Sequence, residues 1–408
     1  MKRIIIILFF IPFFAFTQQG IQFEHGTTWV KVLAKAKAEK KYIFVDAFAT
    51  WCGPCKYMAA KVFTQEQVGD IYNSTFINVK AQMDTSAKDN EEVKQWYADA
   101  HKMGKDYKIN VYPTFLFFSP EGKLVHRVVG SMEADKFSSK AKSVMNVEGQ
   151  YYTMLDKYKS GKKAPDFLRT LAHLAEEAYD NENISPIAND YLSTQNDYLT
   201  NENVDFIFHF VNNTKSVGFK VLTDNEAKFN QLKNNTSATD KIVEIVKEEE
   251  LYPYFKKKST IAPDWKTINS TITKKYPKHA DEVITGGKAT YFKSKKDWPN
   301  FQPAVQQYMK NYGDKATPAL LNEYAWTVFE NCNEATVLQD ALNWSKQSIK
   351  DKEDPSYIDT YANLLYKTGK KDEAVVWEEK AMSMVSDQEK TDFSETIEKM
   401  KTGTKTWK

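Results

Sequence analysis

The sequence predicts an α/β domain followed by a longer all-helical region, and three observations support this fold class. An apolar stretch of β-branched and aromatic residues, 42–45, is followed after a short loop by a helical pattern over 54–63. From about residue 149 to residue 408, helical spacing dominates and no convincing strand pattern occurs. Near the end, Ala341 and Trp344 recur as Ala374 and Trp377, each 33 positions later, close to the ~34-residue period of one class of helix-pair repeat.

The first residues have the pattern of a signal peptide. Lys2 and Arg3 precede an unbroken apolar run over residues 4–16, and Ala15 and Thr17 are small residues at positions that a signal peptidase recognises. The run is shorter than the ~20 apolar residues that a membrane-spanning helix needs. We therefore expect a signal peptide at 1–17 and an exported protein, with an uncleaved membrane anchor as the alternative.

Length and charge restrict the remaining possibilities. A chain of 408 residues implies two or three domains. The formal net charge of +2 falls to zero when Lys2 and Arg3 are removed with the signal peptide. A near-neutral mature chain disfavours nucleic acid or an anionic membrane surface as the main partner.

The elements of the α/β domain can be predicted in order. An amphipathic run from Trp29 to Lys40 predicts a helix, which Thr27 or Thr28 can cap by accepting a hydrogen bond from a free N–H. The strand over 42–45 continues to Asp46 and leads into the helix over 54–63.

Cys52 and Cys55 form a C-x-x-C pair at the start of that helix. Pro54 suits a helix start because it lacks the N–H that the first turn leaves unpaired. The helix N-terminus favours a thiolate, so we expect Cys52 to be the exposed nucleophile and Cys55 to resolve its mixed disulfide. Half of a zinc site or a structural disulfide remain alternatives, although no second cysteine pair occurs among the three cysteines and we expect no metal.

These motifs resemble the thioredoxin superfamily. Residues 51–56, WCGPCK, are similar to its active-site signature, and residues 111–118, VYPTFLFF, are similar to the strand that follows its cis proline. The turn at 121–123 and Gly130 continue the resemblance, which covers roughly 21–147 and includes an extra helical insertion at 81–108. It implies a central mixed sheet flanked by helices, and the insertion is similar to that of the larger extracytoplasmic thioredoxin-like proteins of bacteria. With the signal peptide, we expect the bacterial periplasm as the location.

The resemblance also implies roles for individual residues. Asp46 would lie beneath the resolving cysteine and relay its proton; a partly solvated acid at the strand end is the alternative. Pro113 would be cis and, with Tyr112, would hold an extended substrate backbone, while Trp51 would dock the substrate or shield the disulfide. Gly53 and Pro54 form the active-site loop and resemble the reducing members of the family more than the oxidising ones.

The rest of the chain predicts helices in two parts, an α-helical domain at 150–315 and repeats at 316–408 that resemble tetratricopeptide repeats. Stacked units of this kind form an α-solenoid with a concave surface. We expect turns at 159–161, 184–186 and 286–287. The third cysteine, Cys332, lies in an apolar helical segment and is expected to be a buried, inert thiol.

Together these features predict an exported thiol–disulfide oxidoreductase that reduces or exchanges protein disulfides through Cys52 and Cys55. Its partners would be protein thiols or disulfides, a thiol electron donor or acceptor, and a client protein on the helical region. We expect no cofactor beyond the redox-active disulfide. The alternative is a non-catalytic scaffold, in which the repeats bind a partner and the thioredoxin-like unit only docks it.

Overall fold

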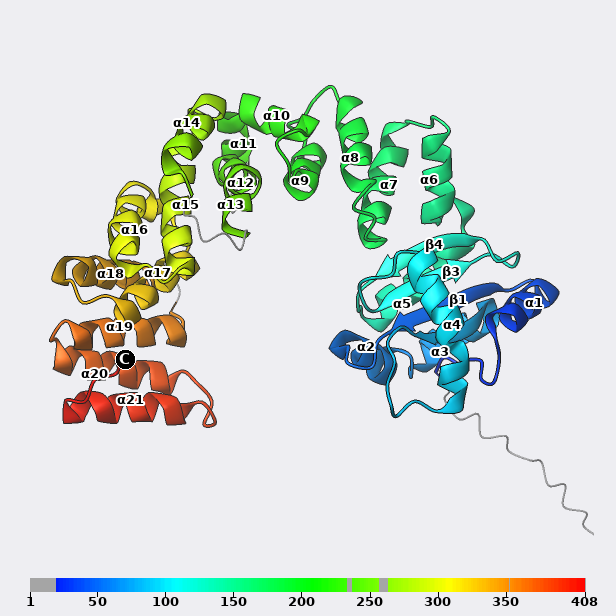
Figure 1. Cartoon of the computed structure of the whole chain (residues 1–408), viewed down its shortest axis with the longest axis horizontal. Helices are drawn as coiled ribbons and strands as arrows, with labels where there is room; N and C mark the ends of the chain where they lie inside the picture. The colour runs from blue at the N-terminus through cyan, green and yellow to red at the C-terminus, as the bar shows by residue number, and fades with distance from the viewer. Residues whose placement is uncertain (1–19, 233–236, 257–262, 352, 408) are drawn as a thin grey trace, which may run out of the picture. The chain divides into compact units, whose positions relative to one another are not determined.

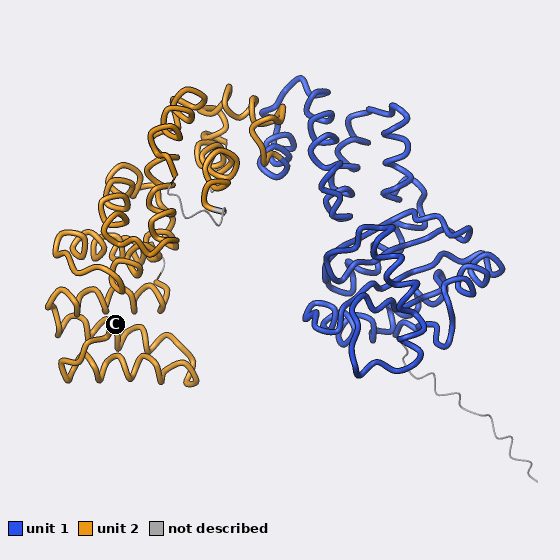
Figure 2. The backbone as a smooth tube through the Cα atoms, in the orientation of Figure 1, with its two compact units in different colours: residues 1–210 blue, residues 211–408 orange. Residues whose placement is uncertain are grey.

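The structure is a computed structural model that describes residues 20–232, 237–256, 263–351 and 353–407. The segment expected to be a signal peptide, 1–17, lies outside the described residues. The chain forms two compact units, Met1–Phe210 and Val211–Lys408, which Figure 2 shows in different colours. This division falls later than residue 147, where the α/β pattern ends. The three domains expected at 21–147, 150–315 and 316–408 stay a prediction.

The first unit is built on a four-stranded mixed sheet in the order β2-β1-β3-β4. The strands are β1 (Tyr42–Phe48), β2 (Phe76–Gln82), β3 (Thr114–Phe118) and β4 (Leu124–Val129). The central strand β1 pairs in parallel with β2 and antiparallel with β3, which in turn pairs antiparallel with β4. The expected turn between β3 and β4 contains Gly122, whose φ of 80° favours glycine.

Helices cover both faces of this sheet (Figure 1). They are α1 (Trp29–Glu39), α2 (Gly53–Tyr57), the π-helical turn η1 (Met58–Val62), α3 (Glu66–Thr75), α4 (Glu91–Asp106) and α5 (Ala134–Met145). Thr28 caps α1 by accepting a hydrogen bond from the backbone N–H of Lys31. The helix expected over 54–63 is α2 continued by η1, and the expected helical insertion at 81–108 contains α4.

The alternation of side chains along β1 decides which residues face the redox helix. Ile43 and Val45 pack in the cluster that includes α1 and α4 residues. Phe44 packs on the opposite face, in the cluster that includes Met58 of η1 and residues of α3 and α5. Asp46 has the same parity as Phe44, so its side chain lies on the face covered by the helix that begins with the cysteine pair.

Four further helices belong to the first unit. After the short 3-10 turn η2 (Val147–Gly149) come α6 (Tyr151–Lys159), α7 (Pro165–Glu177), α8 (Ile184–Ser193) and α9 (Asn201–Phe210). The backbone N–H of Tyr151 donates to Nδ1 of buried His126 over 3.0 Å, which anchors the start of α6 to β4. Burial lowers the pKa of His126 to about 3, so its ring is a neutral acceptor.

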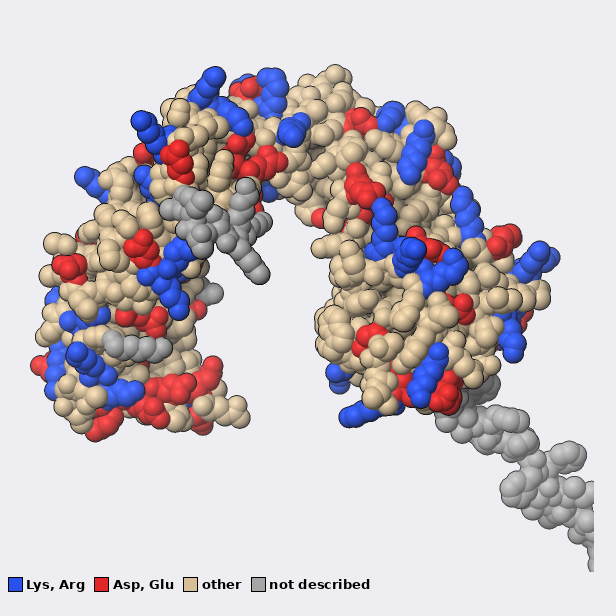
Figure 3. Space-filling view, viewed as in Figure 1, with Lys and Arg blue, Asp and Glu red and all other residues tan. Residues whose placement is uncertain are grey.

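The second unit contains helices and connecting loops, with no β-strand among its described residues. Its elements are α10 (Val217–Asp224), α11 (Glu226–Leu232), α12 (Ala238–Val246), η3 (Lys247–Leu251), α13 (Pro253–Lys256), α14 (Trp265–Lys275), α15 (Ala280–Ser294), α16 (Trp298–Tyr312), η4 (Gly313–Lys315), α17 (Pro318–Asn331), α18 (Ala335–Ser348), α19 (Pro355–Lys367), α20 (Lys371–Ser383) and α21 (Lys390–Thr402). On the face seen in Figure 3, basic and acidic side chains are interspersed over each unit. Within the described residues, we find no helix with the length and apolar character that crossing a membrane requires.

The C-terminal helices form tetratricopeptide-like pairs, α17 with α18 and α19 with α20. Equivalent small residues are completely buried in both pairs, Ala325 and Ala362 in the first helices and Ala341 and Ala374 in the second. Cys332, at the end of α17, is 2% exposed, and burial raises the pKa of its thiol to about 11. This agrees with the expected inert thiol.

Two of the three expected turns are wrong, while the turn at 159–161 is present with Gly161 at a φ of 100°. Pro186 lies in the first turn of α8, where its missing N–H is tolerated. Gly286 and Gly287 lie inside α15. A Cβ atom at Gly287 would stand only 1.9 Å from Cδ2 of Leu251 in η3, so the glycine permits a close approach of two helices.

Candidate active site

The cysteine pair lies where β1 gives way to the first turn of α2. The structure has a Cys52–Cys55 disulfide with Cα atoms 5.3 Å apart. Cys52 is the N-cap residue of α2, and its Sγ accepts a hydrogen bond from the backbone N–H of Cys55 over 3.1 Å. Pro54 occupies the first helical turn, as expected from its missing N–H.

The expectation of an exposed Cys52 is wrong for this disulfide form. Cys52 is 3% exposed and Cys55 6% exposed, and both pack with Ala49 against Phe48 and Tyr112. The exposed group is Trp51, at 69%. Its ring stands edge-on to that of Tyr112, with centroids 5.8 Å apart. The loop after β1 places the two cysteines against Phe48 and against Tyr112 from a distant segment, while the Trp51 indole remains exposed.

Pro113 enters β3 through a cis peptide bond with Tyr112. Pro113 is buried, and its carbonyl oxygen accepts from the backbone N–H of Gly130, over 2.9 Å, at the end of β4. Thr114 closes the same turn by donating its hydroxyl to the carbonyl oxygen of Val111. These hydrogen bonds fix the backbone around Pro113, and the preceding residue, Tyr112, packs against the cysteine pair.

Asp46 is buried, with 3% of its surface exposed. Burial raises the pKa of its carboxyl from 3.8 to about 7, and the positive charge of Lys80 partly opposes this. Lys80 lies opposite Asp46 in the parallel pairing of β1 and β2. Asp46 Oδ1 makes no hydrogen bond with any described residue. A carboxyl in this environment changes its charge near neutral pH, which is the property that a proton relay needs.

Three residues around the site were not predicted. Lys80 is the first, and only strand register brings it to Asp46. Asp84 holds the loop before the cysteines, because its carboxylate accepts from the backbone N–H of Thr50 over 3.0 Å. Glu133 accepts a hydrogen bond from the hydroxyl of Tyr57, over 2.6 Å, which links α2 to the residue before α5. Their acidic or basic character was visible in the sequence, but no local pattern connected them to the cysteines.

A C-x-x-C disulfide at a helix N-terminus after a sheet strand, packed against the residue that precedes a cis proline, defines a dithiol–disulfide exchange site. The chain is accordingly a thiol–disulfide oxidoreductase by class.

Comparisons with known proteins place this class in a family. The model of the thioredoxin-like domain family matches residues 30–144. Thioredoxin H1 of Arabidopsis thaliana is 32% identical over 115 residues, which are 28% of this chain and 84% of that protein. The thiol:disulfide interchange protein DsbD of Pseudoalteromonas atlantica is 33% identical over 115 residues, 28% of this chain and 18% of that protein. A solution structure of a candidate disulphide-isomerase from Bacteroides thetaiotaomicron is 33% identical, with a TM-score of 0.26, and the match covers 31% of this chain and 95% of that one.

The chain belongs to the thioredoxin-like family, through the part that contains the sheet and the cysteine pair. A tetratricopeptide-like helical region follows that domain in the same chain.

Proposed function

We propose that this protein is exported and reduces or exchanges disulfides of protein substrates through Cys52 and Cys55. The observation that carries the proposal is the cysteine pair at the start of α2, packed against Tyr112. Unpaired N–H groups at the start of a helix favour the thiolate form of the first cysteine, and the thiolate is the nucleophile in disulfide exchange.

The exchange proceeds in two balanced steps. In the reduced protein, the Cys52 thiolate attacks one sulfur of a substrate disulfide, forms a mixed disulfide and releases the other substrate sulfur as a thiolate. The Cys55 thiol then loses its proton and attacks Cys52 Sγ, which forms the Cys52–Cys55 disulfide and releases the second substrate thiolate. The substrate gains two electrons, and a thiol donor restores the dithiol by the reverse exchange.

We assign the proton transfer to Asp46. Its carboxyl faces the side of the sheet that the redox helix covers, and its pKa of about 7 makes it half ionised at neutral pH. As a carboxylate it accepts the proton of Cys55; as a carboxylic acid it returns a proton in the reverse direction.

Substrate binding is assigned to the loop groups beside the disulfide. Trp51 is exposed and stands edge-on to Tyr112, which offers an aromatic edge to an incoming chain. The Tyr112 backbone before the cis Pro113 is free of the β-ladder, because β3 begins only at Thr114, and it can pair with an extended peptide. Gly53 leaves room beside the cysteines, since a Cβ atom there would meet nothing within 4 Å.

Three further parts of the proposal concern location, partner binding and the redox group. Export to the bacterial periplasm is proposed from the pattern of residues 1–17. We propose that the helical repeats bind a client or partner protein, because stacked helix pairs form extended binding surfaces. The disulfide is proposed as the sole redox group. Fractionation of a bacterium expressing the full gene product tests the location, with recovery in the cytoplasm as the contrary result.

Insulin reduction by the mature protein with dithiothreitol tests the central proposal. The wild type should accelerate precipitation of the insulin chains, and Cys52→Ser should abolish the acceleration because no nucleophile remains. Cys332→Ala is the matched control, since this cysteine is buried away from exchange chemistry, and it should retain full activity. If wild type and Cys52→Ser are equally inactive, the scaffold hypothesis is preferred.

A trapping experiment identifies the substrates. In Cys55→Ser the second step is blocked, so clients should accumulate as mixed disulfides on Cys52 that dithiothreitol releases. The double variant Cys52→Ser/Cys55→Ser should capture none of them.

A further inference from the structure

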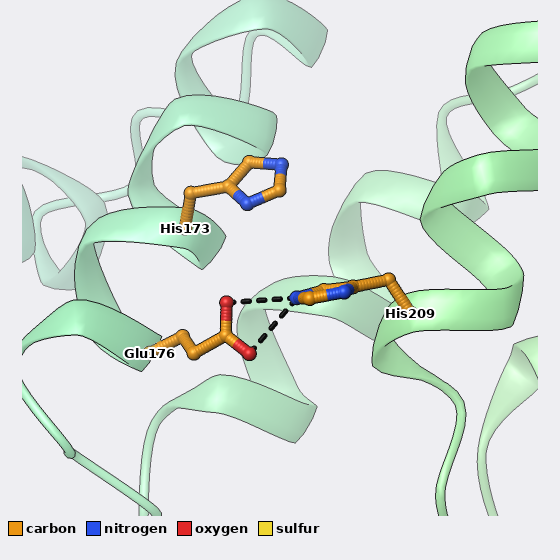
Figure 4. Close-up of side chains that lie close together, drawn as sticks. All are labelled: His173, Glu176 and His209. Atoms are coloured by element: carbon orange, nitrogen blue, oxygen red, sulfur yellow. Dashed lines mark hydrogen bonds and ion pairs between the residues drawn. The ribbon is translucent and has the colours of Figure 1, made fainter. Parts of the chain in front are cut away.

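Two histidines and a glutamate converge on the helices that follow the sheet. His173 and Glu176 lie one turn apart on α7, and His209 projects from α9 towards them (Figure 4). Nε2 of His209 is 2.8 Å from each carboxylate oxygen of Glu176. One possible ligand atom from each residue lies within 4.8 Å of the other two, and this is the one such trio of His, Cys, Asp or Glu side chains among the described residues.

Packing holds these rings in place. The ring of His173 stands edge-on to that of Phe210, with centroids 4.9 Å apart, and to that of Phe206 at 6.1 Å. Both phenylalanines are buried on the inner side of α9, and Phe206 packs in turn against Tyr191 of α8. Ring contacts with Phe206 and Phe210 therefore orient the imidazole of His173. Among the three side chains drawn in Figure 4, the dashed interactions join only Glu176 and His209.

The trio is also accessible. All three residues are exposed, and a cavity of about 310 Å³ opens beside the two histidines. Arg169 is the neighbouring cation on α7, and it is ion-paired with Glu202 of α9. The cavity lining presents both imidazoles, and the Glu176 carboxylate lies against His209 outside that lining. The positive charge of Arg169 is already paired.

We propose that His173, Glu176 and His209 bind a divalent transition-metal ion of the Zn²⁺ type. Imidazole nitrogens and a carboxylate oxygen are a donor set that zinc uses, with bond lengths of about 2.0–2.2 Å. Tetrahedral geometry at those lengths separates ligand atoms by roughly 3.4 Å. The 2.8 Å separation between His209 Nε2 and the Glu176 oxygens must increase slightly, and the His173 ring must move towards both groups. Rotation of side chains on α7 and α9 supplies these movements. Three protein ligands leave one position open to water.

The competing explanation is an ordinary ion pair between Glu176 and His209. Such a pair needs no contribution from His173 and has no preference among metal ions. These two differences make the proposal testable, and the test is independent of the thiol chemistry.

The experiment uses the complete mature chain in its disulfide form, without a histidine tag, so that Cys52 and Cys55 present no thiolates to the metal. Titration calorimetry with Zn²⁺ at neutral pH should give one ion per chain. His173→Gln, Glu176→Gln and His209→Gln should each weaken binding by at least about tenfold, since even second-shell changes cost 10–100-fold. His101→Gln, at another exposed histidine, should bind as the wild type does.

Thermal unfolding provides a second measurement. Zn²⁺ should raise the Tm of the wild type and of His101→Gln but not of the three ligand variants, whose folding is checked by circular dichroism in the absence of metal. Excess Mg²⁺ should not compete, because it prefers an all-oxygen shell. Absence of Zn²⁺ binding, binding that survives His173→Gln, or equal competition by Mg²⁺ would each overturn the proposal.

Discussion

Each unit of the molecule buries an acid, and the two acids have different neighbours. In the first unit, Asp46 on β1 is 3% exposed and lies opposite Lys80. In the second unit, Glu378 on α20 is completely buried beside Asp359 of α19. Burial raises the pKa of both carboxyls. The cation beside Asp46 limits the rise to about 7, whereas the second acid beside Glu378 raises its pKa further, well above the neutral range.

The difference shows how a neighbour's charge decides what a buried acid can do. Asp46 can gain or lose a proton at neutral pH, so it can act as an acid and a base. Glu378 stays protonated, so it behaves as a polar packing group between two helices of a repeat. The same desolvation penalty therefore supports chemistry in one region and a fixed, neutral contact in the other.

The largest expected effect is that of Asp46→Asn on catalysis. Without a base, resolution of the mixed disulfide by Cys55 should slow by about 100-fold at pH 8. In the wild type, the rate of this step should rise with pH through about 7 as Asp46 ionises. Stopped-flow measurement of disulfide formation between pH 5 and 9, followed by the fluorescence of Trp51, records both effects.

Asp70→Asn, at an exposed acid of α3, is the control and should leave the rate unchanged. An unaltered rate and pH profile in Asp46→Asn would remove Asp46 from the mechanism.

The stability of the disulfide form gives a further check on Asp46. The raised pKa means that the folded protein binds a proton more tightly than the unfolded chain between pH 3.8 and about 7. The free energy of unfolding of the wild type therefore falls as pH rises through this range. Above about pH 7, Asp46→Asn should be more stable than the wild type by up to about 4 kcal/mol.

Glu378→Gln should have a smaller effect, confined to stability. Its folded pKa is also raised, so the free energy of unfolding falls as pH rises from about 4.5, but the fall should continue beyond pH 7. The variant should be more stable than the wild type by on the order of 2 kcal/mol at pH 7, and insulin reduction should be unaffected. Urea unfolding at several pH values measures the difference.

The neighbouring Glu379→Gln is the matched control for that prediction. Glu379 forms an exposed ion pair with Lys401, so its loss should change stability by less than about 1 kcal/mol. A Glu378→Gln difference that does not vary with pH would break the comparison, because it would make Glu378 an ordinary ionised acid.

The smallest effect is expected at Lys80, and it tests the neighbour directly. Lys80→Met keeps an apolar chain near Phe23 and Phe48, over whose rings the lysine Nζ lies, but removes the charge. The pH midpoint of the resolving step should then move upward by about one pH unit or less. Lys80→Arg should keep the wild-type midpoint. A midpoint that is the same in Lys80→Met would show that the lysine does not tune Asp46.

Much of this fold was predictable because its signals are local. The strand before the C-x-x-C pair, the cap at Thr28 and the turn at Gly122 arise from neighbours in the sequence. The 33-residue spacing of Ala341 and Ala374 is likewise visible in the sequence, as a repeat period. The site residues Cys52 and Cys55 follow from the same kind of signal, since their spacing places both on one helical turn.

The failures share a different cause. Gly286 and Gly287 look like a turn in the sequence, yet they lie within α15 because η3 packs against them too closely for a side chain. The inward position of Cys52 depends on Tyr112, which arrives from a distant segment. In each case a contact between remote parts of the chain outweighs the local preference.

The sequence by itself determined the order of elements and the redox pair, since periodicity, capping and cysteine spacing act over one or two helical turns. Only the tertiary structure decided that Lys80 faces Asp46 and that His209 meets His173 and Glu176. Strand register and helix packing set those distances, and both depend on the whole core being assembled at once.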